Sequence, residues 1–274
     1  MPAPHLTPQL VARAERFQAC FHAARMGALT ALPGNPFGAE VRAFGSGFGI
    51  ACKVRHPLLR GKNRVHGLSA ADMDSLNDLL RFYRADGLPC SLSVLHGEMT
   101  EALFSRLASA GLWSAGSGTV PAIIPEGRAD EGVPPGITVR RSGPEEKELY
   151  LDLFRLAFAD RGEADPEYRA IQWAEDSLPG GVRYIAELGG KPVGMAAFPI
   201  VDGVGYFGTA GVLPEYRHRG IQSALIRRRL ADALALGCDL ALGGGSAGTT
   251  HYRNFERAGL HLIPTGMHWT DTSV

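Results

Sequence analysis

The chain has 274 residues, of which 45% are hydrophobic and 20% are charged. This composition is enough for a sizeable core, and the length suits one large domain or two small ones. Its 28 basic and 28 acidic side chains give a formal net charge of zero, which argues against nucleic acid or an anionic membrane as a partner.

The cysteines and the N-terminal residues bear on the cellular compartment. The four cysteines are scattered and form no Cys-x-x-Cys pair, so neither a metal site nor a disulfide framework is expected. The first residues have no basic region followed by an apolar core, and no run approaches the roughly 18 apolar residues that a membrane span requires. We therefore expect a cytoplasmic protein.

The first half of the sequence alternates helical and strand patterns, which is typical of an α/β protein. Apolar residues at helical spacing predict a helix over 8–25. The glycine-rich segment 45–49 is followed by a strand pattern at 50–54 and no helix, so it predicts a hairpin turn and not a phosphate loop. The remaining elements expected here are a strand at 64–68, a helix from Ser69 to Gly87, a strand at 89–95, a helix at 100–110 and a strand region ending at Ile124.

The stretch 126–136 is rich in proline, glycine and acidic residues and has little to bury, so it is the expected linker. In the second half, helices are expected from Pro144, over 166–177, over 220–237 and over 249–257. Strands are expected at 137–140, 206–213, 238–242 and 260–270, with a hairpin formed by 182–188 and 193–200. The residues expected to face inward on the helices from Pro144 and Gly220 are Leu149, Leu153, Leu156, Ala157, Ile226, Leu230, Ala233 and Leu234.

The two halves match element by element, and each has a short helix ending in Ala-Gly-Leu, at 110–112 and 258–260. Such long-range self-similarity indicates a duplication. The expected domains are therefore 1–125 and 137–274.

A basic turn at 214–220 separates an apolar run from a helical pattern in the second half. Gly220 allows the backbone to approach a bulky group, and the exposed N–H groups of the following helix favour an anion. Arg217, His218 and Arg219 add positive charge, so a diphosphate is the expected ligand. The turn lacks the spacing of a nucleotide P-loop or a dinucleotide fold.

This stretch resembles the acetyl-CoA signature of the GNAT superfamily of N-acetyltransferases, Arg/Gln-x-x-Gly-x-Gly/Ala, with Arg217, Gly220 and Gln222 at the motif positions. Gln222 is a departure, because a small residue is usual there. The resemblance implies an α/β (α+β) fold of two GNAT-like domains, each a central mixed, mostly antiparallel sheet flanked by helices. In the first half, the corresponding stretch 65–72 has no arginine before its glycine, and Asp72 and Asp74 follow. That half is interpreted as a degenerate domain that lacks the acetyl-CoA signature.

The resemblance also implies how acetyl-CoA is held as a co-substrate. The pantetheine arm is expected to contact the backbone of Ala210 and Val212, and Asn254 either donates to the pantetheine amides or caps the structure. No metal is implied. The residues expected at the diphosphate, besides the motif residue Arg217, are Arg219, Gly220, Ile221, Gln222 and Ser223.

Acyl transfer to an amine needs a neutral amine and a proton for the departing thiolate. GNAT enzymes often use a tyrosine of the last helix as the proton donor, but Phe255 stands in its place here. Tyr252, one turn earlier, either substitutes for it or packs at the domain interface. His251 is a candidate base, with an unperturbed pKa of about 6.5; Glu187 and Asp202 are alternatives that act through water.

Two further features are open to more than one interpretation. The arginines at 227–229 lie about 100° apart on a helix and cannot share a face, so we expect one to reach the 3′-phosphate of CoA and the others to be solvated. The acceptor is expected to bind between the halves or against the hairpin. Trp173, Tyr184 and Phe198 either line this acceptor site or belong to the core.

The sequence thus predicts an acetyl-CoA-dependent N-acetyltransferase that moves an acetyl group to a primary amine by direct transfer in a ternary complex. The acceptor is expected to be a small-molecule amine or a protein amino group, and the protein a monomer or homodimer. The alternative is a catalytically inactive CoA-binding regulatory or assembly module.

Overall fold

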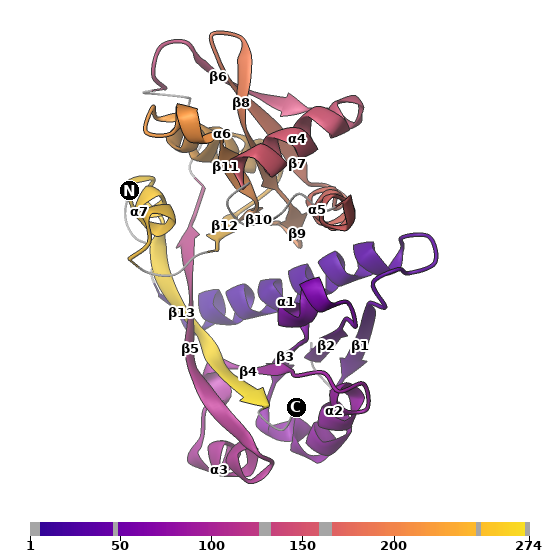
Figure 1. Ribbon diagram of the computed structural model, residues 1–274. Coiled ribbons are helices and arrows are strands. Elements are labelled where there is room, and N and C mark those ends of the chain that lie inside the picture. Colours follow the sequence, from indigo (N-terminus) through magenta and orange to yellow (C-terminus); the bar gives the residue numbers. More distant parts are fainter. Residues whose placement is uncertain (1–5, 46–48, 126–132, 159–165, 245–247, 272–274) are drawn as a thin grey trace. The chain divides into compact units, whose positions relative to one another are not determined.

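A computed structural model of the chain describes residues 6–45, 49–125, 133–158, 166–244 and 248–271 (Figure 1). The residues cluster into two compact units. One contains residues 5–120 and 263–274, here the N-terminal unit, and the other contains residues 1–4 and 121–262, here the C-terminal unit. The C-terminal residues thus group with the first half of the chain, because strand β13 (His261–Asp271) pairs with strand β4 (Ser91–Val94).

The division into domains 1–125 and 137–274 concerns ancestry and stays a prediction. Residues 126–132 of the expected linker lie outside the described residues. The remaining part leads directly into strand β6 (Ile137–Ser142), where the N–H of Ile137 donates to the carbonyl of Pro134 (3.2 Å).

The N-terminal unit begins with helix α1 (Pro8–Thr30), whose N-terminus is capped by Thr7. Strands β1 (Glu40–Phe44) and β2 (Gly49–Lys53) form the predicted hairpin, and β2 pairs with β3 (Arg64–Leu68) antiparallel. Strand β3 pairs with β4 in parallel, and β4 with β13 antiparallel. The other elements are η1 (Pro57–Lys62), η2 (Ala70–Ser75), α2 (Leu76–Arg84), η3 (His96–Glu98), α3 (Glu101–Ser109) and β5 (Leu112–Ile123).

The C-terminal unit contains an antiparallel sheet in the order β11-β8-β7-β6, formed by Ala210–Val212, Lys191–Phe198, Val182–Leu188 and Ile137–Ser142. A second group of strands has the order β9-β10-β12, with the end of β5 beside β12; its members are Ile200–Val201, Val204–Phe207 and Leu240–Gly243. The helical elements are η4 (Pro144–Glu146), α4 (Lys147–Ala157), α5 (Pro166–Asp176), η6 (Pro214–Tyr216), α6 (Ile221–Ala235) and α7 (Thr250–Arg257). The predicted fold class, mixed sheets that are mostly antiparallel and flanked by helices, is confirmed.

The inward faces of two helices differ from the prediction. Leu156 of α4 and Leu234 of α6 are exposed, by 41% and 45%. On α4 the buried stripe instead runs through Tyr150, Leu151, Leu153, Phe154 and Ala157. Helical spacing alone admits two neighbouring faces, and the aromatic residues at 150 and 154 select the one that is buried.

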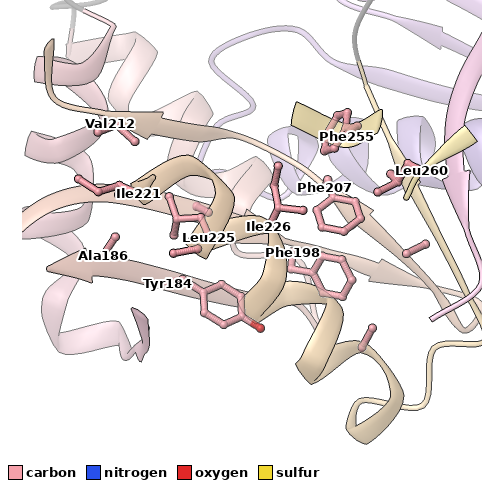
Figure 2. Packing of buried hydrophobic residues seen from close by; sticks show 14 of the residues in the cluster. Tyr184, Ala186, Phe198, Phe207, Val212, Ile221, Leu225, Ile226, Phe255 and Leu260 are labelled. Atoms are coloured by element: carbon pink, nitrogen blue, oxygen red, sulfur yellow. The ribbon is translucent and has the colours of Figure 1, made fainter. Parts of the chain in front are cut away.

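The aromatic residues of the hairpin belong to the core. Tyr184 and Phe198 are fully buried among the apolar residues that α6 and the sheet share (Figure 2). Trp173 is half-buried, and its ring stacks against the guanidinium of Arg183 at 4.4 Å.

Among the described helices, none combines the length and apolar character of a membrane span.

Candidate active site

The apolar run 206–213, expected as one strand, forms two strands that belong to different sheets. Strand β10 runs parallel to β12, with Phe207 opposite Gly243. After Gly208 and Thr209 the chain continues as β11, which pairs antiparallel with β8. Strand β11 therefore diverges from β12, and the single-strand prediction was wrong because the pairing with β8 is non-local.

The register of β11 shows which backbone groups face the diverging side. The N–H of Ala197 donates to the carbonyl of Thr209 (2.7 Å), and the N–H of Leu213 donates to the carbonyl of Val193 (2.9 Å). In an antiparallel ladder, the residues between such pairs point their N–H and C=O groups away from the partner strand. Ala210 and Val212 therefore direct these groups to the outer edge of β11, which is the end strand of its sheet.

The turn after β11 ends at Gly220, which has a left-handed conformation (φ 86°) and precedes α6. A side chain at this position is strained, and a Cβ atom would lie 2.9 Å from Cγ of Pro134. No side chain caps the helix. The first backbone N–H groups of α6, those of Ile221, Gln222 and Ser223, are the groups that a helix N-terminus offers to an anion.

The two arginines of the turn lie in different environments. Arg217 donates from Nη2 to the carbonyl of Ala157 (2.8 Å) and from Nε to the carbonyl of Val212 (3.2 Å). It therefore fastens the turn to the end of α4 and to β11. Arg219 is exposed, and its guanidinium lies over the ring of Tyr216 at 5.5 Å.

The corresponding turn of the N-terminal unit differs in having a carboxylate at the start of its helical segment. Ser69 donates from its N–H and from its hydroxyl to one carboxylate oxygen of Asp72, at 3.0 and 2.6 Å. A carboxylate thus occupies the start of this helical segment, where α6 has no side-chain cap.

The run of arginines at 227–229 contains a buried member, so the prediction that those not reaching CoA are solvated was wrong. Arg229 is 1% exposed, and its guanidinium lies over the ring of Phe207 at 4.8 Å. It donates to the carbonyls of Leu225 (3.0 Å) and Ala197 (3.2 Å). Burial lowers the pKa of Arg229 to about 10. Arg228 is half-buried and pairs with Asp232 (3.1 Å), whereas Arg227 is exposed.

Helix α7 carries the candidate catalytic residues. Its N-terminus is capped by Thr249, whose hydroxyl oxygen accepts from the N–H of Tyr252 (3.2 Å). Tyr252 is 7% exposed, and its pKa is raised by loss of hydration and by the carboxylate of Glu256, with which its hydroxyl is hydrogen-bonded. Asn254 accepts a hydrogen bond from Arg257 (3.0 Å) on the same helix.

Phe255, at the position of the family tyrosine, is fully buried. Its ring packs against Phe207, with centroids 5.4 Å apart (Figure 2). It also packs against the ring of His251, at 4.6 Å. A Cβ atom at Gly243 would lie 2.8 Å from this ring. Phe255 therefore completes the core between α7 and β12 and offers no proton.

The alternative bases are placed differently. The carboxylate of Glu187 pairs with Arg140 (2.8 Å), which makes it part of an ion pair that joins β6 to β7. Asp202 lies in the β9–β10 turn with a positive φ of 49°.

Two polar features near the divergence of β11 were not predicted. Gln172 donates to the hydroxyl of Thr209 (2.8 Å) and to Asp176 (2.5 Å), and so fixes the crossover between β10 and β11. The hydroxyl of Tyr206 lies beside Gly244, where a Cβ atom would be 2.3 Å away. Gln172 was hidden in an irregular helical pattern, and Tyr206 was counted as part of the apolar run.

The site thus consists of a parallel strand pair whose continuation diverges, followed by a glycine-initiated helix without a side-chain cap. Residues 147–259 match the model of the acetyltransferase (GNAT) family. This match to the GNAT family lies within the second half of the chain, and the resemblance inferred from the motif is confirmed. No curated protein sequence matches the chain.

Solved structures support the same fold over the whole chain. A GCN5-related N-acetyltransferase from Kribbella flavida is 20% identical with a TM-score of 0.63, covering 93% of this chain and 96% of that one. A tandem GNAT protein from the clavulanic acid biosynthesis pathway is 13% identical with a TM-score of 0.58, covering 94% of both chains. FemX is 13% identical with a TM-score of 0.59, covering 98% of this chain and 97% of that one. At these identities the likeness establishes the fold.

The described residues also bear on metal chemistry. No group of three or more His, Cys, Asp or Glu side chains among them is placed to hold a metal ion.

Proposed function

We propose that the chain is an acetyl-CoA-dependent N-acetyltransferase that moves an acetyl group to a primary amine by direct transfer in a ternary complex. The family match supports acyl transfer. The observation that carries the assignment of acetyl-CoA is the divergence of β11 from β12 together with the uncapped, glycine-initiated N-terminus of α6. Acetyl-CoA supplies the activated acetyl group.

The backbone has the main role in binding. The outward N–H and C=O groups of Ala210 and the outward N–H of Val212 match the amides of a pantetheine arm, whereas the carbonyl of Val212 accepts from Arg217. The N–H groups that begin α6 suit the diphosphate, and Arg219 adds charge from the surface. Arg217 acts by holding the turn in place, since its guanidinium is engaged with two backbone carbonyls.

The transfer step forms a C–N bond as the C–S bond breaks, and the departing thiolate takes up a proton. Tyr252 is the candidate donor of this proton, because a tyrosine hydroxyl is protonated at neutral pH. Tyr206, beside the diverging strands, is a second candidate donor. His251 is the candidate base for the amine, and Asn254 a candidate contact for the pantetheine arm. A small-molecule amine or a protein amino group is the proposed acceptor.

Thermal unfolding with acetyl-CoA, free CoA and ATP tests cofactor binding. A ligand at one hundred times its Kd stabilises a single site by about 2.7 kcal/mol, which raises Tm measurably. Arg219→Glu is expected to abolish this rise, whereas Arg155→Glu, an exposed charge reversal on α4, is expected to preserve it. An equal response of both variants would contradict the assignment of the diphosphate turn.

Release of CoA with a panel of amines then tests turnover. Release that depends on an amine supports the transferase. Binding of acetyl-CoA without release against a broad panel would instead identify an inactive CoA-binding module.

A further inference from the structure

One face of the sheet in the N-terminal unit is polar where helix α1 covers it. The opposite face is apolar and contributes to the core of α2 and α3; its residues include Val65, Leu92 and Trp269. Side chains alternate along a strand, so His66, Ser93 and His268 point to the other face. The ring of His66 lies 5.1 Å from that of His22 on α1, which places this face under the helix.

The strand register brings these polar residues together in one row. His268 of β13 is directly opposite Ser93 of β4. On the other side of β4, Val65 of β3 is opposite Leu92, and the register shifts after it, at His66 and Gly67. His66 and His268 thus come from the two strands on either side of β4, which carries Ser93.

Several nitrogen atoms in this region are buried without a hydrogen-bond partner. They are Gln18 Nε2, Arg64 Nε, His66 Nε2 and His268 Nδ1. Gln18 lies one turn before His22 on α1, and Arg64 lies two residues before His66 on β3, so both belong to the same interface. His66 is only 4% exposed.

Arg64 is the cation of this region, and the nearby buried carboxylate of Glu15 on α1 already accepts from the N–H of His96 (2.7 Å). Within the described ranges no carboxylate pairs with Arg64, and burial lowers the pKa of its guanidinium. Arg64 is half-buried, but its Nε is buried without a partner, and buried polar atoms are almost always hydrogen-bonded. Metal binding does not resolve this, because the described histidines do not form a metal-binding group and a guanidinium is not a metal ligand. The missing partner must accept hydrogen bonds and carry negative charge.

We propose that Gln18, His22, Arg64, His66, Ser93 and His268, here the α1–β3 polar cluster, form a binding site for a small oxyanion with the chemistry of a carboxylate or of inorganic phosphate. Arg64 supplies the charge, and the imidazole of His66 and the amide of Gln18 donate hydrogen bonds. The site lies wholly within the N-terminal unit and does not depend on the proposed acetyl-CoA site. It gives the half without the acetyl-CoA signature a ligand of its own.

Nearby backbone keeps the site close-packed. Strand β5 passes His268 at Gly118, where a Cβ atom would lie 2.9 Å from Nε2 of His268 and 2.4 Å from the hydroxyl of Thr265. Gly118→Ala is therefore expected to displace the His268 ring and weaken the site without removing any charge.

The site can be tested by NMR of the imidazole nitrogens in the full chain at pH 7 and constant ionic strength. Sodium acetate, sodium phosphate and the neutral isostere acetamide are titrated separately, and the signals of His66 are assigned with His66→Gln. Saturable shifts of His66 and His268 are expected with acetate, phosphate or both, and not with acetamide. The anion that binds distinguishes the two sources.

Variants test the role of the arginine. Arg64→Gln is expected to raise the Kd of the anion about tenfold or more, whereas Arg60→Gln, which removes an exposed charge from η1, is expected to leave it unchanged. The proposal is overturned if neither anion causes saturable shifts, if acetamide acts like acetate, or if Arg64→Gln binds as tightly as the wild type. If Arg64→Gln does not fold, the comparison of acetate with acetamide on the wild type still decides.

Discussion

Lowering the pH from 7 to 5 is expected to destabilise the N-terminal unit through His22 and His66. The ring of His22 is buried, with Nε2 2.8 Å from the carbonyl oxygen of Lys62. Burial lowers its pKa to about 3, and the charges of Arg25, Lys62 and Arg64 act in the same direction.

His66 titrates in the same sense. Burial lowers its pKa well below 6.5, as do the neighbouring His22, Arg64 and His268. A histidine whose folded pKa lies below its unfolded pKa binds more protons when unfolded. The stability it supports is therefore present above pH 6.5 and is lost as the pH falls towards the folded value.

The pKa shift of His22 sets the magnitude of the expected loss of stability at pH 5. Between an unfolded pKa of 6.5 and pH 5 lie 1.5 pH units, and each unit is worth about 1.4 kcal/mol. His22 thus costs about 2 kcal/mol at pH 5, and His66 adds to the loss in the same direction. Glu15 offsets part of this, because burial raises the pKa of its carboxyl and its protonation in the folded state adds stability as the pH falls.

Urea unfolding followed by circular dichroism at pH 7, 6 and 5, in buffers free of carboxylate and phosphate, measures the effect. His22→Gln keeps a donor for the Lys62 carbonyl but does not titrate, so its loss between pH 7 and pH 5 should be about 2 kcal/mol smaller than that of the wild type. His261→Gln, which removes an exposed imidazole, should show the full loss. A wild type equally stable at pH 7 and pH 5, or an undiminished loss in His22→Gln, would refute the reasoning.

Three further predictions concern the C-terminal unit. Gly220→Ala is expected to cost about 1–2 kcal/mol of stability for its left-handed conformation and to abolish the Tm rise with acetyl-CoA, whereas Gly237→Ala, also left-handed (φ 77°) but with open space around it, should cost as much and still bind. Tyr252→Phe is expected to lower kcat for CoA release by roughly 100-fold or more with little change in Kd for acetyl-CoA; an unchanged kcat would transfer the role to another donor. Asp232→Ala removes the acceptor of the buried Tyr184 hydroxyl (2.9 Å). It is expected to lower the free energy of unfolding by about 3 kcal/mol. A loss below about 1 kcal/mol would show that the hydrogen bond between Tyr184 and Asp232 is dispensable.

Local patterns predicted most elements and the candidate cofactor turn. The hairpin at 45–49, the strand at 64–68 and the helix that begins after Gly220 all follow from residues close together in the sequence. The functional turn is local in the same sense, because a glycine in a left-handed conformation and a helix N-terminus need no distant partner.

Non-local pairing explains what the sequence did not predict. The break between β10 and β11 depends on β8, because β11 pairs with residues of β8 that lie more than ten positions earlier in the sequence. The burial of Arg229 depends on the carbonyl of Ala197 and the ring of Phe207, which come from other strands. Three successive arginines look alike in sequence, and only the packing of α6 against the sheet distinguishes them.

An arginine in each unit, half-buried Arg64 and buried Arg229, has a buried guanidinium nitrogen, and the two differ in whether that nitrogen has a partner. Arg229 is buried more deeply, yet its guanidinium meets two carbonyl oxygens and an aromatic ring. Arg64 lies on a strand whose alternating sequence is typical of one face in water, but α1 covers that face. Among the described residues Arg229 has acceptors and Nε of Arg64 has none, and this difference is the observation on which the proposed oxyanion site rests.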